Sequence, residues 1–238
     1  MRFRRQRVIW VCLGVTWASV GWAEPTQGRE DWIEDPYAPH VTRGSTVRVG
    51  TAAGFLYGER VDAIAIGLTA AVGQRFDRLT LESELAHMSL EAFGGMSEPL
   101  GRAERLGVIA RYDVARLGSE LVGGNSMLAV YVEGGAGVAW NHWYAPGDRE
   151  PPRIVPADSK RVEGQVGFGL ALDHRLQEPI GFPRRVAWFL GWRLALAPHA
   201  SEPATVCRAA TCMVAEPSTA PRFTDRSMLF QSSLAVTW

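Results

Sequence analysis

Two side chains in the segment His87-Met88-Ser89 have the types that nucleophilic catalysis uses. Residues i and i+2 of a β-strand point to the same face, so the His87 imidazole could serve as a base for the Ser89 hydroxyl. The competing interpretation is structural: both residues are polar because the strand ends nearby. The pair is therefore a candidate catalytic site. Whether it could act as one depends on where its strand places the two side chains.

A larger set of ionisable residues recurs at alternate positions of apolar segments. Buried charges cost several kcal/mol each unless they are paired and hydrogen-bonded. The set contains six residues of each sign, which allows complete pairing and predicts an ion-paired interior, with a narrow charge-lined pore as the functional alternative. Its members are Arg48, Glu82, Glu84, Arg105, Arg111, Asp113, Glu133, Arg161, Glu163, Asp173, Arg185 and Arg193.

Cys207 and Cys212 lie close together in the stretch CRAATC. In an exported protein the surroundings are oxidising, so this spacing predicts a local disulfide. It does not complete a metal site of known spacing. We expect no metal and no cofactor.

Eight segments alternate between apolar and other residues with the period of two that is typical of strands. All 14 prolines of the chain fall outside them, as expected because proline cannot donate to a sheet ladder. The predicted strands are 45–57, 62–74, 78–90, 103–116, 126–140, 160–173, 184–197 and 226–238.

One face of these strands is bulky and apolar, whereas the other holds small residues and the charges. Alternation alone does not say which face is inside. An eight-stranded barrel is just wide enough to be filled by side chains, and the bulky face, with its tryptophans, would overfill it. We therefore predict that the apolar face points outward, toward lipid.

Strand length and connections agree with this orientation. Thirteen residues tilted by about 45° span roughly 30 Å, and short connections alternate with longer ones. A closed sheet leaves no unpaired edge in hydrocarbon. We predict an all-β fold, a closed eight-stranded antiparallel up-and-down transmembrane β-barrel over residues 45–238. A soluble periplasmic barrel is the alternative.

The N-terminus has the pattern of an export signal. Four arginines precede an apolar run, and Gly21-Trp22-Ala23 offers small residues for cleavage after Ala23. We expect residues 1–23 to be a signal peptide and 24–44 a periplasmic segment. Removing 1–23 leaves 21 basic against 25 acidic residues, so we expect no nucleic-acid partner.

The last strand ends on an aromatic residue and has apolar residues at alternate positions before it. Phe230, Leu234, Val236 and Trp238 resemble the C-terminal insertion signal of Gram-negative outer-membrane proteins, although Ser232 departs from it. The layout resembles the small outer-membrane barrels of the outer-membrane protein A and X type. That resemblance implies residence in the outer membrane, contact with its lipid and lipopolysaccharide, and insertion by the barrel assembly machinery.

The His87-x-Ser89 pair resembles a fragment of the PagL-type lipid A deacylases, whose pair lies on the outside of a small barrel near a glutamate. The resemblance implies that Glu91, Glu98 or Glu104 would complete the site. Leu90 stands where that family has asparagine, and the pair lies in the third strand rather than near the end of the barrel.

The long connections 141–159 and 198–225 are rich in proline and predict either stiff solvated loops or a platform for an extracellular ligand. We expect Trp238 at the periplasmic rim and Tyr57, Trp140, Trp143 and Tyr144 at the outer rim. The favoured function is an outer-membrane barrel with a structural or surface-interaction role and no chemistry of its own. The alternatives are an outer-leaflet lipid-modifying enzyme and a narrow channel.

Overall fold

The computed structural model describes residues 43–57, 62–92, 99–117, 126–145, 153–156, 158–176, 183–198, 204–208, 211–214 and 225–238. No helix in this part of the chain is long and apolar enough to cross a membrane. The eight long strands are β1 (Arg43–Tyr57), β2 (Asp62–Phe76), β3 (Leu79–Ala92), β4 (Pro99–Leu117), β5 (Ser126–Trp143), β7 (Ser159–Arg175), β8 (Arg185–Ala197) and β11 (Asp225–Thr237).

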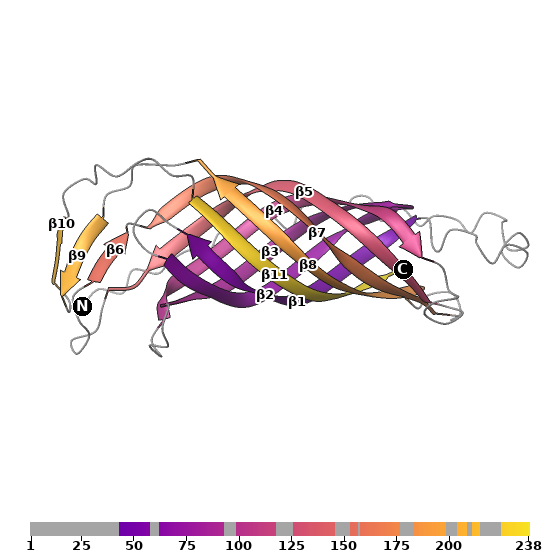
Figure 1. Cartoon of the computed structure of the whole chain (residues 1–238), viewed down its shortest axis with the longest axis horizontal. Coiled ribbons are helices and arrows are strands. Elements are labelled where there is room, and N and C mark those ends of the chain that lie inside the picture. The colour runs from indigo at the N-terminus through magenta and orange to yellow at the C-terminus, as the bar shows by residue number, and fades with distance from the viewer. Residues whose placement is uncertain are drawn as a thin grey trace, which may run out of the picture. The chain divides into compact units, whose positions relative to one another are not determined.

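These strands form one closed barrel in the order β1-β11-β8-β7-β5-β4-β3-β2, and all neighbours are antiparallel. Figure 1 shows them running obliquely around the barrel axis. Each long strand pairs with its neighbour in sequence, and β11 returns to β1, so every strand has two partners. The predicted closed eight-stranded antiparallel barrel is confirmed.

The tilt of the strands can be read from their register. Starting at Val47, the paired residues lead through Val72, Ser83, Val108, Ala136, Gly164, Leu196 and Arg226 back to β1 at Tyr57. One circuit of the barrel along paired residues therefore shifts the position on β1 by ten residues, from Val47 to Tyr57. With eight strands, such a stagger gives a narrow barrel whose interior is filled by side chains.

The apolar face points outward, as the volume argument predicts. Leu68 of β2 and Phe168 of β7 are 67% and 61% exposed, whereas Arg48 of β1 points inward and is 1% exposed. The small-residue face lines the interior, where Ala52, Ala63 and similar side chains are buried. The outer surface of the barrel is therefore the more apolar one.

The two ends of the barrel differ in their connections. The turn end carries Trp238 and the short connections 77–78, 118–125 and 176–184. The loop end, opposite to it, carries the connections 58–61, 93–98, 144–158 and 198–224. Asp77 in the first turn has a positive φ of 49°.

Strand bounds differ from the predicted ones mainly at the loop end. β4 begins at Pro99, four residues before the predicted start, and β5 continues to Trp143 instead of residue 140. Proline is compatible with the first residue of a strand because the donor it lacks is not needed there. The prediction for this strand was short because Pro99 and Gly101 resemble a loop.

The interior of the barrel contains two apolar clusters with charged side chains between them along the strands. The loop-end cluster consists of Leu56, Ala63, Ala65, Met88, Leu90, Ala103 and Leu229, and Leu100 and Trp143 pack against it. The turn-end cluster consists of Ala129, Tyr131, Ala171, Ala187, Phe189 and Ala235. Both clusters use the inward parity, so apolar side chains lie on either side of the charges in the middle of the barrel, and further buried charges lie at the turn end.

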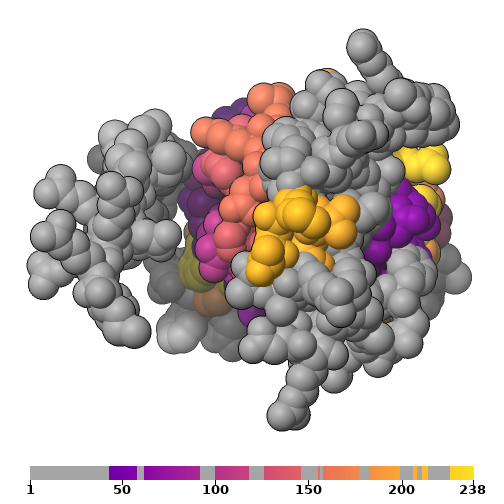
Figure 2. Space-filling view, turned by 90° about the vertical axis from the view of Figure 1, so that its left-hand side faces the viewer, coloured from indigo at the N-terminus to yellow at the C-terminus, as the bar shows by residue number. Residues whose placement is uncertain are grey.

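Three short strands form a second sheet that the sequence analysis did not predict. They are β6 (Arg153–Pro156), β9 (Ala204–Arg208) and β10 (Thr211–Val214), in the order β10-β9-β6. β6 lies in the connection between β5 and β7, and β9 and β10 lie in the one between β8 and β11, so two of the loop-end connections contribute. Figure 2 views the molecule from this side, with the atoms of β9 and β10 gathered in one patch.

Candidate functional site

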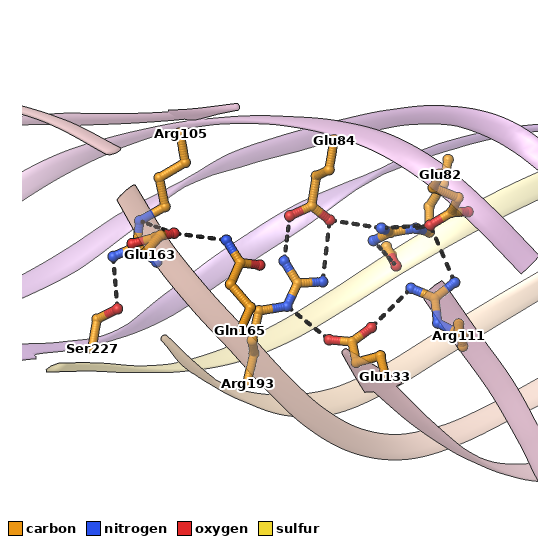
Figure 3. A network of polar contacts seen from close by, with 11 residues as sticks. Glu82, Glu84, Arg105, Arg111, Glu133, Glu163, Gln165, Arg193 and Ser227 are labelled. Atoms are coloured by element: carbon orange, nitrogen blue, oxygen red, sulfur yellow. Dashed lines mark hydrogen bonds and ion pairs between the residues drawn. The ribbon is translucent and has the colours of Figure 1, made fainter. Parts of the chain in front are cut away.

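Inside the barrel, six charged side chains form a closed ring of alternating sign, which we call the ionic ring (Figure 3). Each carboxylate contacts two guanidinium groups, and each guanidinium contacts two carboxylates. In cyclic order the members are Arg48, Glu84, Arg193, Glu133, Arg111 and Glu82.

Arg48 of β1 joins the two glutamates of β3. Its Nη2 donates to Glu82 Oε2 at 2.9 Å and to Glu84 Oε2 at 2.6 Å, and its Nε donates to Glu82 Oε2 at 3.1 Å. Its Nη1 reaches Ser233 Oγ of β11 at 3.4 Å. One arginine thus connects three strands that are distant in sequence.

Arg193 and Arg111 complete the ring from the other side. Arg193 of β8 donates through Nη1 to Glu84 Oε1, and its Nε donates to Glu133 Oε1 at 2.7 Å. Arg111 of β4 donates from Nη2 to Glu133 Oε2 at 3.1 Å, and its Nη1 lies 3.4 Å from Glu82 Oε2. The ring is electrically neutral, which is the condition under which buried charges are tolerated.

Arg111 also stacks on the turn-end apolar cluster. Its guanidinium carbon lies 4.9 Å from the Tyr131 ring centroid and 4.5 Å from the Phe189 ring centroid, distances typical of cation–π contacts. A Cβ at Gly191 would lie 2.2 Å from the Tyr131 hydroxyl oxygen. A side chain at this position would crowd the tyrosine, so the glycine makes room for it.

A second group of ion pairs lies at the turn end. Arg75 Nη2 donates to Asp113 Oδ2 at 2.8 Å, and Arg185 donates to Asp173. Arg75 lies one residue beyond the predicted strand 62–74 and is therefore absent from the predicted interior charges. The signal was present, since Arg75 continues the inward parity of its strand.

Toward the loop end the interior charges are paired less closely. Arg105 Nη2 donates to Ser227 Oγ at 2.6 Å, and its Nε lies 3.6 Å from Glu163 Oε1. Gln165 Nε2 donates to Glu163 Oε1 at 2.6 Å. Figure 3 shows these residues beside the ionic ring.

The structure places eleven of the twelve predicted interior charges at 8% exposure or less. Arg161 is the exception and is half-buried. The ring unites six of them, and Arg105, Glu163, Asp113, Asp173 and Arg185 belong to the separate groups toward the two ends. The sequence pattern indicated which residues face inward but not which partners they choose.

His87 and Ser89 lie on the outer face of β3, as their parity predicts, because Met88 and Leu90 point inward. Of the predicted third partners, Glu104 lies near His87, with Oε1 3.6 Å from His87 Nδ1 and 3.8 Å from Arg102 Nε. No hydrogen bond joins Ser89 to His87 in the described part of β3. The structure thus brings together two of the three groups that a serine hydrolase site needs.

The predicted disulfide between Cys207 and Cys212 is present and joins paired positions of β9 and β10. At the base of this region, His142 Nδ1 lies 2.5 Å from Asp158 Oδ2, and the Trp143 backbone N–H donates to Asp158 Oδ1 at 3.0 Å. The long connections therefore contain ordered structure, whereas the sequence analysis expected only loops.

The aromatic residues at the loop end have different roles. Tyr57 and Trp140 lie at the ends of β1 and β5, where Arg226 and Lys160 stack on them at 5.4 Å and 5.5 Å. Trp143, expected at the outer rim, is the last residue of β5 at the loop end and packs against the loop-end cluster. Tyr144 N–H donates to the Leu100 carbonyl at 2.8 Å.

The last strand is held along its whole length. Phe230, Leu234 and Val236 lie on the outward parity of β11, and the Trp238 backbone N–H donates to the Ser45 carbonyl at 3.1 Å. The chain end is therefore anchored by its pairing with β1.

Several predictions fall on residues outside the described part of the chain. These are the signal peptide at residues 1–23, most of the segment 24–44, and Glu98. Among the described residues, no group of three or more histidine, cysteine or acidic side chains is placed to hold a metal ion.

Comparison with known proteins gives structural matches only. No family profile and no curated protein matches the sequence. Neisserial surface protein A is similar in structure, with a TM-score of 0.50 and 12% identity over 82% of this chain and 97% of that one. This is the fold of the small outer-membrane barrels. The outer-membrane protein OprG of Pseudomonas aeruginosa also matches, with a TM-score of 0.40 and 13% identity over 84% of this chain and 98% of that one.

Proposed function

We propose that the chain is an integral β-barrel of the Gram-negative outer membrane with a structural or surface-interaction role. The observation that carries this proposal is the reversed distribution of polarity in a closed barrel. Apolar side chains such as Leu68, Phe168 and Trp188 cover the outside, and a neutral ionic ring fills the inside. In water this arrangement would expose a large apolar surface, whereas in lipid both faces are satisfied.

The filled interior supports a structural role over transport. The ionic ring links β1, β3, β4, β5 and β8 across the lumen, and the apolar clusters lie on either side of it. We expect no stable conductance from the purified barrel in planar bilayers. Regular single-channel steps would instead favour the narrow channel.

The loop end would face outside the cell, since small outer-membrane barrels have short periplasmic turns and longer external loops. That orientation exposes the sheet β10-β9-β6, with its disulfide, to an oxidising medium. An ordered sheet on a rigid barrel suits binding of an extracellular ligand. Residues 1–23 would direct export, and the terminal strand with Trp238 would be read by the barrel assembly machinery.

Membrane fractionation combined with gel migration tests the proposal. The protein should sediment with outer membranes, resist extraction by alkaline carbonate and require detergent for release. The unheated sample should migrate differently from the boiled one, because a closed barrel resists unfolding by the gel detergent. Release without detergent would support the soluble periplasmic barrel and overturn the proposal.

A second candidate function, hydrolysis of an ester in an outer-leaflet lipid, is favoured by the contact between His87 and Glu104 on the lipid-facing surface. In that reaction the Ser89 hydroxyl would attack an acyl ester carbonyl while His87 takes its proton, and His87 would return that proton to the departing sugar hydroxyl. Water would then attack the acyl-Ser89 ester, release the fatty acid and restore the Ser89 hydroxyl. The test is incubation of the purified barrel with lipid A and detection of released fatty acid. Release by the wild type and not by Ser89→Ala would support this function; no release by either would exclude it.

A further inference from the structure

One glycine of the barrel stands apart from the others. Gly164 of β7 lies on the outward parity, between the outward residues Val162 and Val166. A Cβ added to Gly164 would meet no atom within 4 Å, whereas a Cβ at Gly191 or Gly167 would clash with neighbouring groups. Gly164 is therefore not required for packing, and it leaves a gap in the apolar outer surface.

The gap is part of an open apolar groove of about 490 Å³ on the outside of the barrel. Gly164 and Leu196 are the last paired residues of β7 and β8 toward the loop end. Beyond this pair the two strands are no longer joined. The groove is lined by Ala136, Val162, Glu163, Gly164, Leu196, Ala197 and Pro198.

A positive charge lies on the loop-end side of the groove. Lys160 shares the outward parity of β7 with Val162 and Gly164, and it is exposed. Its ammonium nitrogen lies 5.5 Å from the Trp140 ring centroid. No carboxylate lies within ion-pair distance of it in the described part of the chain. The charge is therefore available to an anionic group at the membrane surface.

We propose that this groove binds one acyl chain of a phosphorylated glycolipid of the outer leaflet, lipid A, with a phosphate at Lys160. This inference rests on the proposed function, because it needs the loop end to face the outer leaflet. Charge and shape carry it together. The apolar groove accepts a hydrocarbon chain, and Lys160 lies on the side of the groove where the headgroup of that chain would lie.

Packing explains why the groove would select a lipid. Inside a bilayer an acyl chain gains nothing from leaving water, so selective binding depends on van der Waals fit and on polar contacts at the headgroup. A lysine near the membrane surface strengthens binding of an anionic lipid about fivefold. Both contributions can be removed separately by substitution.

Native mass spectrometry of the full-length barrel in detergent, titrated with purified lipid A, tests the proposal. Gly164→Leu places a side chain in the groove, and its Cβ would meet no atom within 4 Å. Lys160→Gln removes the charge but not the groove. The matched control is Ala70→Leu, which adds a side chain to an exposed position of β2 on the opposite wall of the barrel. Phosphatidylethanolamine, which carries no net charge, is the control lipid.

The wild type and Ala70→Leu should each retain one lipid A, and Gly164→Leu should lose this adduct. Lys160→Gln should weaken lipid A binding about fivefold and leave phosphatidylethanolamine binding unchanged. Equal binding by Gly164→Leu and the wild type, or equal loss by Ala70→Leu, would overturn the proposal. A wild-type dimer that Gly164→Leu abolishes would assign the groove to a second copy of the chain.

The titration in detergent does not depend on where the protein resides in the cell. A folded, heat-modifiable barrel that is absent from outer membranes would overturn the proposed function. The titration with lipid A in detergent would still show whether the groove binds that lipid. A barrel found in outer membranes that binds no lipid A would overturn only the present inference.

Discussion

Replacing Glu84 by glutamine should destabilise the barrel severely. Glu84 accepts hydrogen bonds from Arg48 and Arg193, which are both almost fully buried. The amide keeps the size of the carboxylate but lacks its charge. The variant therefore leaves the ionic ring with one uncompensated positive charge in the lumen.

The expected loss follows from the cost of an unpaired buried charge. Removing one partner of a buried ion pair costs about 3–5 kcal/mol, and Glu84 serves two guanidinium groups. We expect a loss of at least this size in the free energy of unfolding. Removing Arg193 as well restores neutrality, so the double variant with Arg193→Met should lose less than the sum of the single losses.

Urea unfolding of the barrel refolded in lipid vesicles, followed by tryptophan fluorescence, measures these losses. The control is Glu104→Gln on the outer face, where the carboxylate is 45% exposed and its ion-pair distances are 3.6 and 3.8 Å. It should change the free energy by less than about 0.5 kcal/mol. If Glu84→Gln cost no more than this control, the ionic ring would not stabilise the barrel as argued.

Three further changes should have distinct effects. Gly191→Ala should cost about 1–3 kcal/mol by crowding the Tyr131 hydroxyl, and adding Tyr131→Phe should recover part of it; an unchanged unfolding midpoint in urea would contradict the crowding. Reducing the Cys207–Cys212 disulfide should leave heat-modifiable migration intact and speed proteolysis of β9 and β10, since the bond lies outside the barrel; loss of the folded band would count against this. Deleting Trp238 should lower the yield of outer-membrane protein on immunoblots, and full yield would argue against a terminal insertion signal.

The barrel could be predicted from sequence because one physical rule governs every strand. A transmembrane strand must alternate between lipid and lumen, so period two and side-chain volume together decide both the strand positions and the direction of the apolar face. The interior charges follow from the same parity. Arg75 and Phe189 were missed as interior residues, the first by a short strand end and the second because a bulky side chain on the inward face breaks the volume rule.

Partner choice and loop structure could not be predicted in the same way. The contacts of Arg48 with Glu82 and Glu84 depend on the stagger of the closed barrel, which no local pattern encodes. The sheet of β6, β9 and β10 pairs segments from two separate connections, and its strands are too short to show a period. The groove at Gly164 depends on where β7 and β8 part, which is again a property of the register.

Depth-dependent accessibility in bilayers tests the orientation of the barrel most directly. Spin labels placed at Leu68, Val162 and Phe168, each on the outward face, should collide with dissolved oxygen and be shielded from a water-soluble nickel reagent. A label at Met213 on β10, which is exposed on the small sheet, should collide freely with the nickel reagent. Free access of nickel to Leu68 and Phe168 would mean that the apolar face does not meet lipid, and the account would be wrong.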